Sequence, residues 1–385
     1  MNPFTLIQPL IDPPVSHWIW LIPAFLLGGC IGSFLNVVIY RVPLGLSINE
    51  PKRSFCPSCK KPIPMALNLP MISWLWLRGR CRECGVKISF RYFAVEFLTA
   101  VLFTVAWSLF APDALQVVLF LWVVISLWVA IAMIDAEHLI IPIRMTWAGS
   151  AIGLLACAAW PQLPALGGEA GNFWHGLRGG AIGWASGFFG LWLVVELGKL
   201  AFGRRKFSFD EPVDWSLQEA TDDQQPIHFV LNEESISWWD IFSRKSDCLK
   251  IETTDLLLDE KSCGDGLLEI REHAITLPNG TQHRIEDIRS LSGRTRSVVI
   301  PREAMGMGDI HLLGMIGAFT GWMGVIFTIF AASIYAIISA IIGRVGFGKQ
   351  LPFGPFLVLG ALTWLFGGWE IWQWYLNLLG PMAPP

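Results

Sequence analysis

The sequence predicts an all-α polytopic membrane protein of about eight transmembrane helices. It also predicts a small zinc-binding loop domain and a β-rich insertion, both on the cytoplasmic side. The chain of 385 residues is 53% hydrophobic, has only 15% charged residues, and contains 20 Trp and 25 Phe. Four cysteines form two closely spaced pairs, and one internal segment holds most of the acidic residues. A soluble protein of this length rarely has such a composition.

Apolar stretches long enough to cross a bilayer recur along the chain. About 20 helical residues span the roughly 30 Å of hydrocarbon in a membrane. The long stretches are 17–40, 92–111, 115–134, 144–161, 175–202, 323–343 and 353–377. The stretch 309–321 is shorter and forms an eighth span only if it ends near Trp322.

The basic residues predict how these spans are oriented. Segment 41–91 contains ten Lys and Arg against two acidic residues, and more basic residues follow the fifth and seventh spans. The alternate connections, at 112–114, 162–174 and 321–323, contain no Lys or Arg. Because Lys and Arg concentrate in cytoplasmic loops, the basic loops are predicted to be cytoplasmic and both chain ends to lie outside.

The first cytoplasmic loop, 41–91, carries two Cys-x-x-Cys pairs. They are Cys56 with Cys59 and Cys81 with Cys84, separated by 21 residues. This pattern matches a structural zinc site in which four thiolates hold the ion tetrahedrally at about 2.3 Å. A disulfide is disfavoured because the cytoplasm is reducing. The loop is too short and polar to form its own apolar core, so zinc would supply its fold.

A charged insertion separates the fifth and sixth spans. Residues 203–304 hold 20 of the 31 acidic residues together with 13 Lys and Arg. Residues 267–271 alternate as in a strand, and Pro278–Thr281 offers a two-residue hairpin turn. We predict a β-rich module over about 250–300 and a less regular segment over 210–249. Its charge alone indicates a solvated insertion without chemistry of its own.

Two aspartates stand where predicted spans meet the cytoplasm, 174 positions apart. Asp135 ends the third span, and Asp309 follows Gly306-Met307-Gly308. Two close carboxylates that share a proton can activate water for peptide hydrolysis, because like charges in contact push their pKa values apart. The two glycines lack side chains, so backbone and substrate can approach Asp309 closely. Either aspartate alone is more simply explained as a helix-end acid, but Gly-x-Gly-Asp favours the catalytic interpretation.

A series of segments resembles the bacterial type IV prepilin peptidases, in the order of that family. The segments are Gly29–Pro43, the two cysteine pairs, Ile88–Tyr92 with Glu96, Asp135 with Ile141-Pro142, and Gly306–Asp309. Together they cover roughly 1–203 and 304–377, and their combination is highly specific.

This resemblance implies an eight-span aspartic endopeptidase of the Gly-x-Gly-Asp type in the bacterial inner membrane, with Asp135 and Asp309 catalytic. Family members remove the leader of prepilins and pseudopilins after a glycine. They then N-methylate the new N-terminal residue with S-adenosylmethionine. Prepilin and membrane lipid are the expected partners, nucleic acid is not, and the sequence leaves the oligomeric state open. Glu96 lies in a family segment and is a further candidate site residue, while no glycine-rich fingerprint for the methyl donor is visible.

Three features depart from the family pattern. The family usually has Lys two positions after the second aspartate, where this chain has His311, and often an acid where it has Ile143. The connection 203–304 is also much longer than usual. No departure removes a carboxylate, so the expectation of proteolysis stands.

The predicted organisation is therefore a first span, a zinc loop, spans two to five with Asp135, the insertion, and spans six to eight with Asp309. Their ranges are 1–40, 41–91, 92–202, 203–304 and 305–385. Two other classes remain open: a presenilin-like intramembrane aspartic protease, which would place its acids deeper and lacks a four-cysteine loop, and a non-enzymatic membrane assembly factor with a zinc module.

Overall fold

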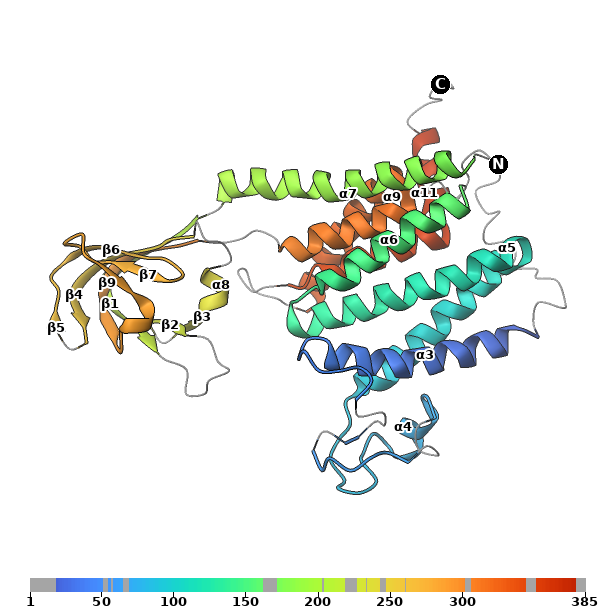
Figure 1. The fold of residues 1–385 in the computed structure, drawn as a ribbon, viewed down its shortest axis with the longest axis horizontal. Helices are drawn as coiled ribbons and strands as arrows, with labels where there is room; N and C mark the ends of the chain where they lie inside the picture. The colour runs from blue at the N-terminus through green and yellow to red at the C-terminus, as the bar shows by residue number, and fades with distance from the viewer. Residues whose placement is uncertain are drawn as a thin grey trace. The chain divides into compact units, whose positions relative to one another are not determined.

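The computed structural model divides into two compact units, each described separately below (Figure 1). One unit comprises Met1–Trp192 and Met307–Pro385, and the other comprises Leu193–Gly306. The structure describes residues 19–50, 55–56, 58–64, 69–161, 172–202, 204–218, 227–232, 234–242, 247–259, 261–301, 306–343 and 351–378. Both chain ends and the basic residues Arg344 and Lys349 lie outside these ranges.

Six helical segments in the described part of the chain are long and apolar enough to cross a membrane. They are Leu21–Arg41 (α3), Phe90–Ala111 and Val117–His138 (both in α5, Phe90–His138), Phe173–Gly198 (in α7, Phe173–Phe202), Met307–Ile342 (α9), and Gly354–Leu378. The last contains α10 (Gly354–Thr363), a π-helical turn (Trp364–Gly368) and α11 (Trp369–Leu378). A shorter apolar helix, α6 (Ile143–Ala159), adjoins them. The prediction of a multi-span helical protein is confirmed.

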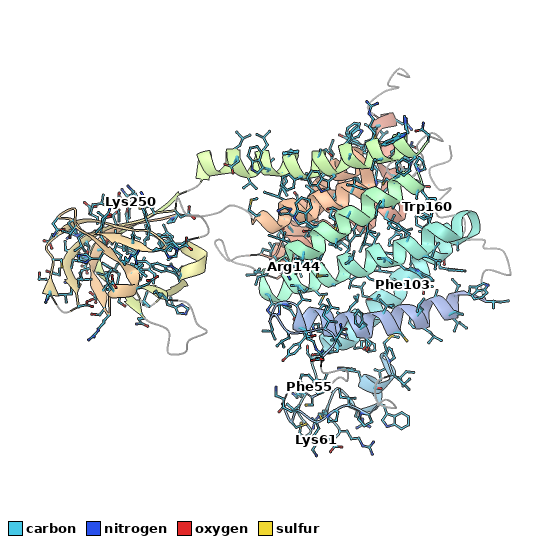
Figure 2. All side chains as sticks on the ribbon, viewed as in Figure 1. Phe55, Lys61, Phe103, Arg144, Trp160 and Lys250 are labelled. Atoms are coloured by element: carbon cyan, nitrogen blue, oxygen red, sulfur yellow. The ribbon has the colours of Figure 1, made fainter. Side chains whose placement is uncertain are left out.

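The two halves of α5 run back along each other. Ser89 caps the helix by accepting a hydrogen bond from the backbone N–H of Arg91. The Trp122 indole donates to the Phe103 carbonyl at 3.0 Å, and the two rings stack at 4.9 Å between centroids. Figure 2 labels Phe103 among the side chains of this unit. Nineteen residues of straight helix would separate these positions by about 28 Å. The chain therefore reverses between them, and α5 forms two antiparallel segments.

Helix α9 also reverses direction. Gly321, at φ 69° and ψ 178°, is not helical. A Cβ placed on Gly317 would lie 2.8 Å from Cγ2 of Val325, although eight residues of straight helix would span about 12 Å. A glycine is needed at 321 because its positive φ strains other residues. The stretch 309–321, the sixth span in chain order, was predicted to end near Trp322, which is one residue from this turn.

Glycines of α7 allow close helix packing. A Cβ on Gly183 would lie 2.1 Å from the Gly317 carbonyl oxygen, and one on Gly187 would lie 2.4 Å from that of Leu313. Larger side chains would hold the backbones of α7 and α9 apart, as at other small-residue contacts between membrane helices.

The second unit is built around one nine-stranded sheet, in the order β3-β2-β1-β9-β4-β6-β7-β8, with β5 paired to β4. The strands are β1 Arg204–Gln218, β2 His228–Leu231, β3 Glu234–Ser237, β4 Leu249–Leu258, β5 Lys261–Ser262, β6 Gly266–Ile270, β7 Ala274–Thr276, β8 Gln282–Arg284 and β9 Leu291–Pro301. The predicted hairpin is present, since β7 pairs with β8. The prediction of a less regular segment over 210–249 was wrong in part. The first residues of this range continue the long strand β1, and they are followed by β2, β3 and the short helix α8 (Trp238–Ile241).

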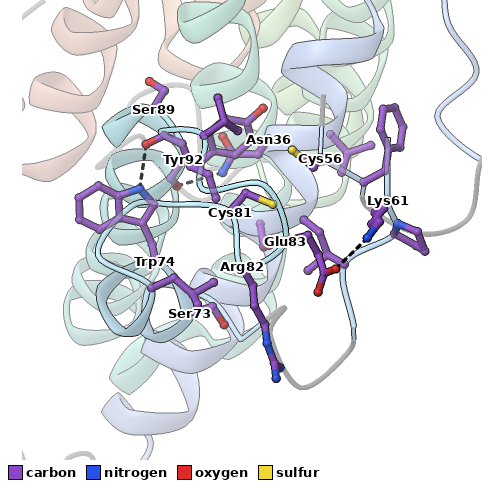
Figure 3. A pocket seen from close by; sticks show the side chains of 18 of the residues that line it. Asn36, Cys56, Lys61, Ser73, Trp74, Cys81, Arg82, Glu83, Ser89 and Tyr92 are labelled. Atoms are coloured by element: carbon purple, nitrogen blue, oxygen red, sulfur yellow. Dashed lines mark hydrogen bonds and ion pairs between the residues drawn. The ribbon is translucent and has the colours of Figure 1, made fainter. Parts of the chain in front are cut away.

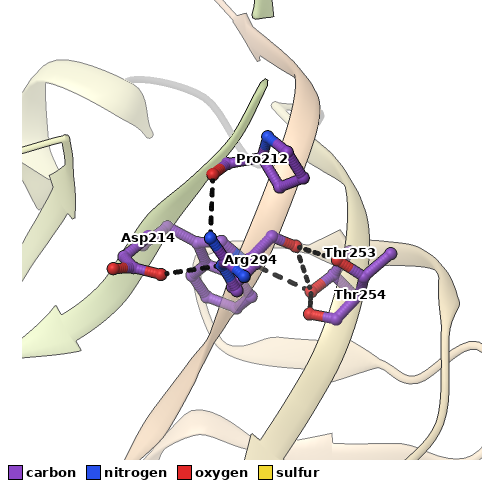
Figure 4. A network of polar contacts seen from close by, with 6 residues as sticks. Pro212, Asp214, Thr253, Thr254 and Arg294 are labelled. Atoms are coloured by element: carbon purple, nitrogen blue, oxygen red, sulfur yellow. Dashed lines mark hydrogen bonds and ion pairs between the residues drawn. The ribbon is translucent and has the colours of Figure 1, made fainter. Parts of the chain in front are cut away.

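The core of this unit is apolar, and polar contacts connect its central strands. Trp215, Trp238 and Phe242 lie in one buried cluster within the module. Across a register shift in β1, Arg294 of β9 pairs with Asp214 at 3.2 Å and donates to the Pro212 carbonyl (Figure 4). Thr254 of β4 donates to the Arg294 carbonyl on the other side. These contacts join β1, β9 and β4 where the regular ladder is interrupted.

Candidate functional site

The segments of the two predicted catalytic aspartates meet around one side chain, Ile141. Asp135 lies in the last turn of α5 and Asp309 in the first turn of α9, and both are buried. A Cβ on Gly308, the neighbour of Asp309, would lie 2.7 Å from Cβ of Ile141. A Cβ on Gly354 would lie 3.2 Å from Cδ1 of Ile141 and 2.7 Å from Oδ2 of Asp135. Both glycine positions therefore require the absence of a side chain.

The local sequence explains this arrangement. Leu139 ends α5 in the left-handed conformation, at φ 54°, and its N–H bonds back to the Asp135 carbonyl. The extended Pro142 then starts α6, so Ile141 lies in the tight connection between the two helices. The Ile-Pro pair thus places an apolar side chain against the start of α9.

Gly354 is a further candidate site residue, which the sequence did not predict. It is the first residue of α10, and its backbone N–H donates to Oδ2 of Asp135 at 2.9 Å. The first N–H groups of a helix have no partner within it, and a carboxylate is favoured there by the helix dipole. The only signal in the sequence was a glycine before Pro355 at the start of an apolar stretch, which is too common to identify a site.

The other predicted residues lie in distinct surroundings. Gly306 is exposed and directly precedes α9. His311 packs its ring against Trp147 and Phe188, at 5.5 and 5.1 Å between centroids, rather than forming an ion pair among the described residues. Glu96 is buried in α5 and accepts a hydrogen bond from the backbone N–H of Met71 at 2.6 Å.

The four cysteines converge as predicted. The Sγ atoms of Cys56, Cys59, Cys81 and Cys84 all lie within 4.8 Å of one another, and those of Cys56 and Cys84 are 3.8 Å apart. Tetrahedral coordination at about 2.3 Å from zinc to sulfur places the sulfurs roughly 3.8 Å apart. The donor set and its spacing fit one zinc ion.

The two cysteine pairs have the same local fold. Lys60 donates its N–H to the Cys56 carbonyl as Gly85 does to that of Cys81, and both residues adopt positive φ. In the first pair, the backbone N–H of Cys59 is the main group that lowers the pKa of the Cys56 thiol, to about 7. Despite the hydrogen bond from the Val86 N–H, burial and the contacts with the other three thiols raise the pKa of Cys84 to about 11. The four thiols therefore do not ionise alike, whereas zinc binds all of its cysteine ligands as thiolates.

An ion pair joins the two turns. Lys61 and Glu83 lie 3.0 Å apart, and the pairing raises the pKa of Lys61 and lowers that of Glu83. Both side chains are largely exposed, so their contribution to stability is small.

The fold and the site define a class: multi-span membrane proteins with a four-thiol cluster and two helix-end aspartates, one of which belongs to a Gly-x-Gly-Asp segment. Comparisons with known proteins agree with this class. The family model described as Bacterial Peptidase A24 N-terminal domain matches residues 26–110, and the one described as Type IV leader peptidase family matches residues 290–341. A prepilin leader peptidase/N-methyltransferase of Aeromonas hydrophila is 33% identical over 94% of this chain and 95% of its own length. The chain belongs to the prepilin leader peptidase/N-methyltransferase family.

Other relatives match over shorter stretches. A prepilin leader peptidase/N-methyltransferase of Myxococcus xanthus is 46% identical over 42% of this chain, a match that spans 45% of that protein. A type 4 prepilin-like proteins leader peptide-processing enzyme of Escherichia coli is 41% identical over 35% of this chain and 55% of its own length. The comparison with solved structures found no match.

Proposed function

We propose that this protein is a membrane aspartic endopeptidase that removes the leader peptide of type IV prepilins or type II secretion pseudopilins at the cytoplasmic face of the bacterial inner membrane. It then N-methylates the new N-terminal residue. The observation that carries the proposal is the meeting of Asp135, Gly308 and Gly354 around Ile141, in a chain whose relatives carry this activity in their names.

In this mechanism Asp135 and Asp309 share one water molecule. One carboxylate acts as the general base on the water while the other, protonated, donates to the scissile carbonyl. The Gly354 N–H binds Oδ2 of Asp135 and fixes the orientation of the carboxylate. Gly306 and Gly308 leave room beside Asp309 for the extended backbone of the substrate.

The proposed topology has eight crossings. The reversals within α5 and at Gly321 divide the helices into eight segments when α6 is included. With the basic loop 41–91 in the cytoplasm, Asp135, Asp309 and Gly354 all lie at cytoplasmic ends of spans. A prepilin whose apolar helix lies in the bilayer and whose basic leader stays in the cytoplasm presents its cleavage site at that face. The insertion 203–304 is proposed to be a separate module of this enzyme.

The cysteine loop is proposed to bind structural zinc through Cys56, Cys59, Cys81 and Cys84. Zinc would fix a loop that has few apolar contacts of its own. S-adenosylmethionine, when bound, would supply an electrophilic methyl group to the new amine, with the S–C bond electrons going to sulfur and a proton leaving the amine.

A presenilin-like protease is the second candidate for the same aspartates. The four-thiol cluster, which that class lacks, favours the prepilin peptidase. A non-enzymatic assembly factor would tolerate loss of either aspartate, so replacement of these residues separates it from both enzymes.

Replacing Cys81 with serine is expected to remove zinc from the purified protein. Wild-type protein should contain about one zinc per chain by elemental analysis, and C81S close to none, since three thiolates close a structural site poorly. Limited proteolysis should then cut within 69–89 while the spans stay protected. C30A, which removes a lone exposed thiol from α3, is the matched control and should retain zinc. Zinc-free wild-type protein with all four thiols open to alkylation would rule out the site.

Excising the insertion is expected to leave leader cleavage intact. The strands β1 and β9 are antiparallel neighbours, with Arg204 opposite Pro301, so the module begins and ends at adjacent positions. Joining Phe207 to Pro301 through a flexible linker should preserve the spans. We expect cleavage within roughly tenfold of the full-length rate, about 1.4 kcal/mol in activation free energy. Complete loss of cleavage in a zinc-loaded deletion protein would instead make the module part of the catalytic machinery.

A further inference from the structure

A cavity of about 400 Å³ lies between the helices α3 and α5 and the cysteine loop (Figure 3). Its walls are mainly apolar and include the aromatic side chains Phe55, Trp74 and Tyr92. Cys56 and Cys81 also line it, so the cysteine loop forms part of its wall. A volume of this size is typical of sites for small ligands, which combine apolar walls with a few placed polar groups.

Asn36 supplies the first of these polar groups. It is 3% exposed, and its side-chain N–H donates to the Tyr92 carbonyl at 3.0 Å. That hydrogen bond fixes the orientation of the Asn36 amide, so Oδ1 is its remaining polar atom. Oδ1 is buried and accepts no hydrogen bond from any residue that the structure describes. A buried acceptor without a hydrogen bond destabilises the folded chain, and a ligand with an N–H or O–H donor would satisfy it.

Glu96 supplies the second polar group of the cavity. Its carboxyl group is buried, accepts from the Met71 N–H, and receives a hydrogen bond from the Ser33 hydroxyl. Within the described residues it has no ion-pair partner. A buried acid is either protonated or offset by a positive charge. A cationic ligand would stabilise the ionised form of Glu96 and would also be attracted by the aromatic faces beside it.

Two exposed residues of the cavity carry the opposite charge, while the exposed Glu83 is paired with Lys61. Arg82 and Lys87 belong to the cysteine loop, line the cavity and are solvent-exposed. A ligand that fits has a cationic centre near Glu96, a flat apolar ring system with donor groups for the aromatic walls and Asn36, and an anionic end for these basic residues. An acyl chain or an apolar side chain offers neither the donor nor the positive charge.

We propose that this cavity binds the methyl donor, S-adenosylmethionine, a sulfonium nucleoside with an amino-substituted purine and a carboxylate. The inference rests on the proposed methyltransferase function and assigns its site. Asn36 accepts a hydrogen bond from the donor, Glu96 offsets the sulfonium and ammonium charges, and Arg82 and Lys87 attract the carboxylate. The cysteine loop thereby acquires a role, because it forms a wall of the donor site.

The cavity and the aspartates share a structural link. Arg91, next to the cavity residue Tyr92, forms an ion pair with Glu137, two residues after Asp135. The helix start that lines the donor site therefore contacts the segment of the peptidase site.

The test is binding of S-adenosylmethionine to the purified full-length enzyme, measured by equilibrium dialysis without prepilin. Glu96→Gln removes the charge but keeps an oxygen that can accept from Met71 and Ser33. Asn36→Leu removes the amide oxygen and keeps the branched shape of the side chain. Each is expected to weaken binding at least about tenfold, and zinc chelation should weaken it as well. Glu286→Gln, an exposed glutamate of the insertion, should bind as wild type does. Zinc content and elution as a single species report folding of each variant.

Unchanged affinity in both Glu96→Gln and Asn36→Leu would overturn the assignment, and so would the absence of binding to wild-type enzyme that cleaves prepilin. Failure of the proposed peptidase is a separate result. It would appear as wild-type enzyme that binds the donor but does not cleave, and in that case the binding data on the two variants still decide the site.

Discussion

Asp135→Asn and Asp309→Asn are each expected to abolish leader removal. Asparagine has nearly the same shape as aspartate but can act neither as a general base nor as a general acid. General acid–base groups contribute typically 10²–10⁴ to a rate, and here both functions depend on the pair. We expect cleavage of a prepilin to fall roughly 10³-fold or more in either variant, measured by the mobility shift of the processed pilin.

The control for these substitutions is Asp287→Asn, an exposed aspartate of the insertion, which should cleave at the wild-type rate. Membrane accumulation and zinc content should match wild type in all three proteins. Substantial cleavage by either Asp135→Asn or Asp309→Asn would contradict the aspartic mechanism and favour an assembly factor.

Gly354→Ala is expected to lower cleavage about 10²-fold without removing either carboxylate. The added Cβ would lie 2.7 Å from Oδ2 of Asp135, so the carboxylate or the start of α10 must move. Displacement of a catalytic group by about 1 Å can cost 10²-fold in rate. The effect should fall on the turnover number more than on substrate binding, because Gly354 contacts the acid rather than the substrate.

Gly190→Ala provides a matched glycine control. Its added Cβ would meet nothing within 4 Å in α7, so activity should be unchanged. If Gly354→Ala cleaved at the wild-type rate, the hydrogen bond from Gly354 would have no part in positioning Asp135.

Features carried by short segments could be predicted from the sequence. The spans follow from apolar length, and the cysteine cluster follows from two Cys-x-x-Cys pairs, each of which fixes its own turn. The candidate aspartates were identified because each belongs to a recognisable local pattern. Their catalytic roles remain proposals.

Features that depend on distant contacts could not be predicted. The hydrogen bond between Gly354 and Asp135 joins positions 219 residues apart and uses a backbone group, which no side-chain pattern reveals. The oxygen of Asn36, which has no hydrogen-bond partner among the described residues, likewise depends on where α5 packs against α3. Only the folded chain shows which side of an apolar helix encloses a cavity.

The first half of the insertion was mispredicted for a different reason. β1 is interrupted by a register shift between Ser208 and Val213, where Pro212 and two acidic residues break the alternation typical of strands. Pairing with β9 on one side and β2 on the other stabilises this strand despite its composition. Tertiary context here outweighs local preference.

The most direct test of the proposed dyad is the distance between the carboxyl groups of Asp135 and Asp309 in the substrate-bound enzyme. It can be measured by electron microscopy of wild-type protein bound to a prepilin whose scissile bond is replaced by an uncleavable isostere. The mechanism predicts that both groups lie within about 3 Å of one shared position, and so roughly 6 Å or less from each other. Carboxyl groups more than about 12 Å apart in that complex, well beyond the reach of one water molecule, would contradict it.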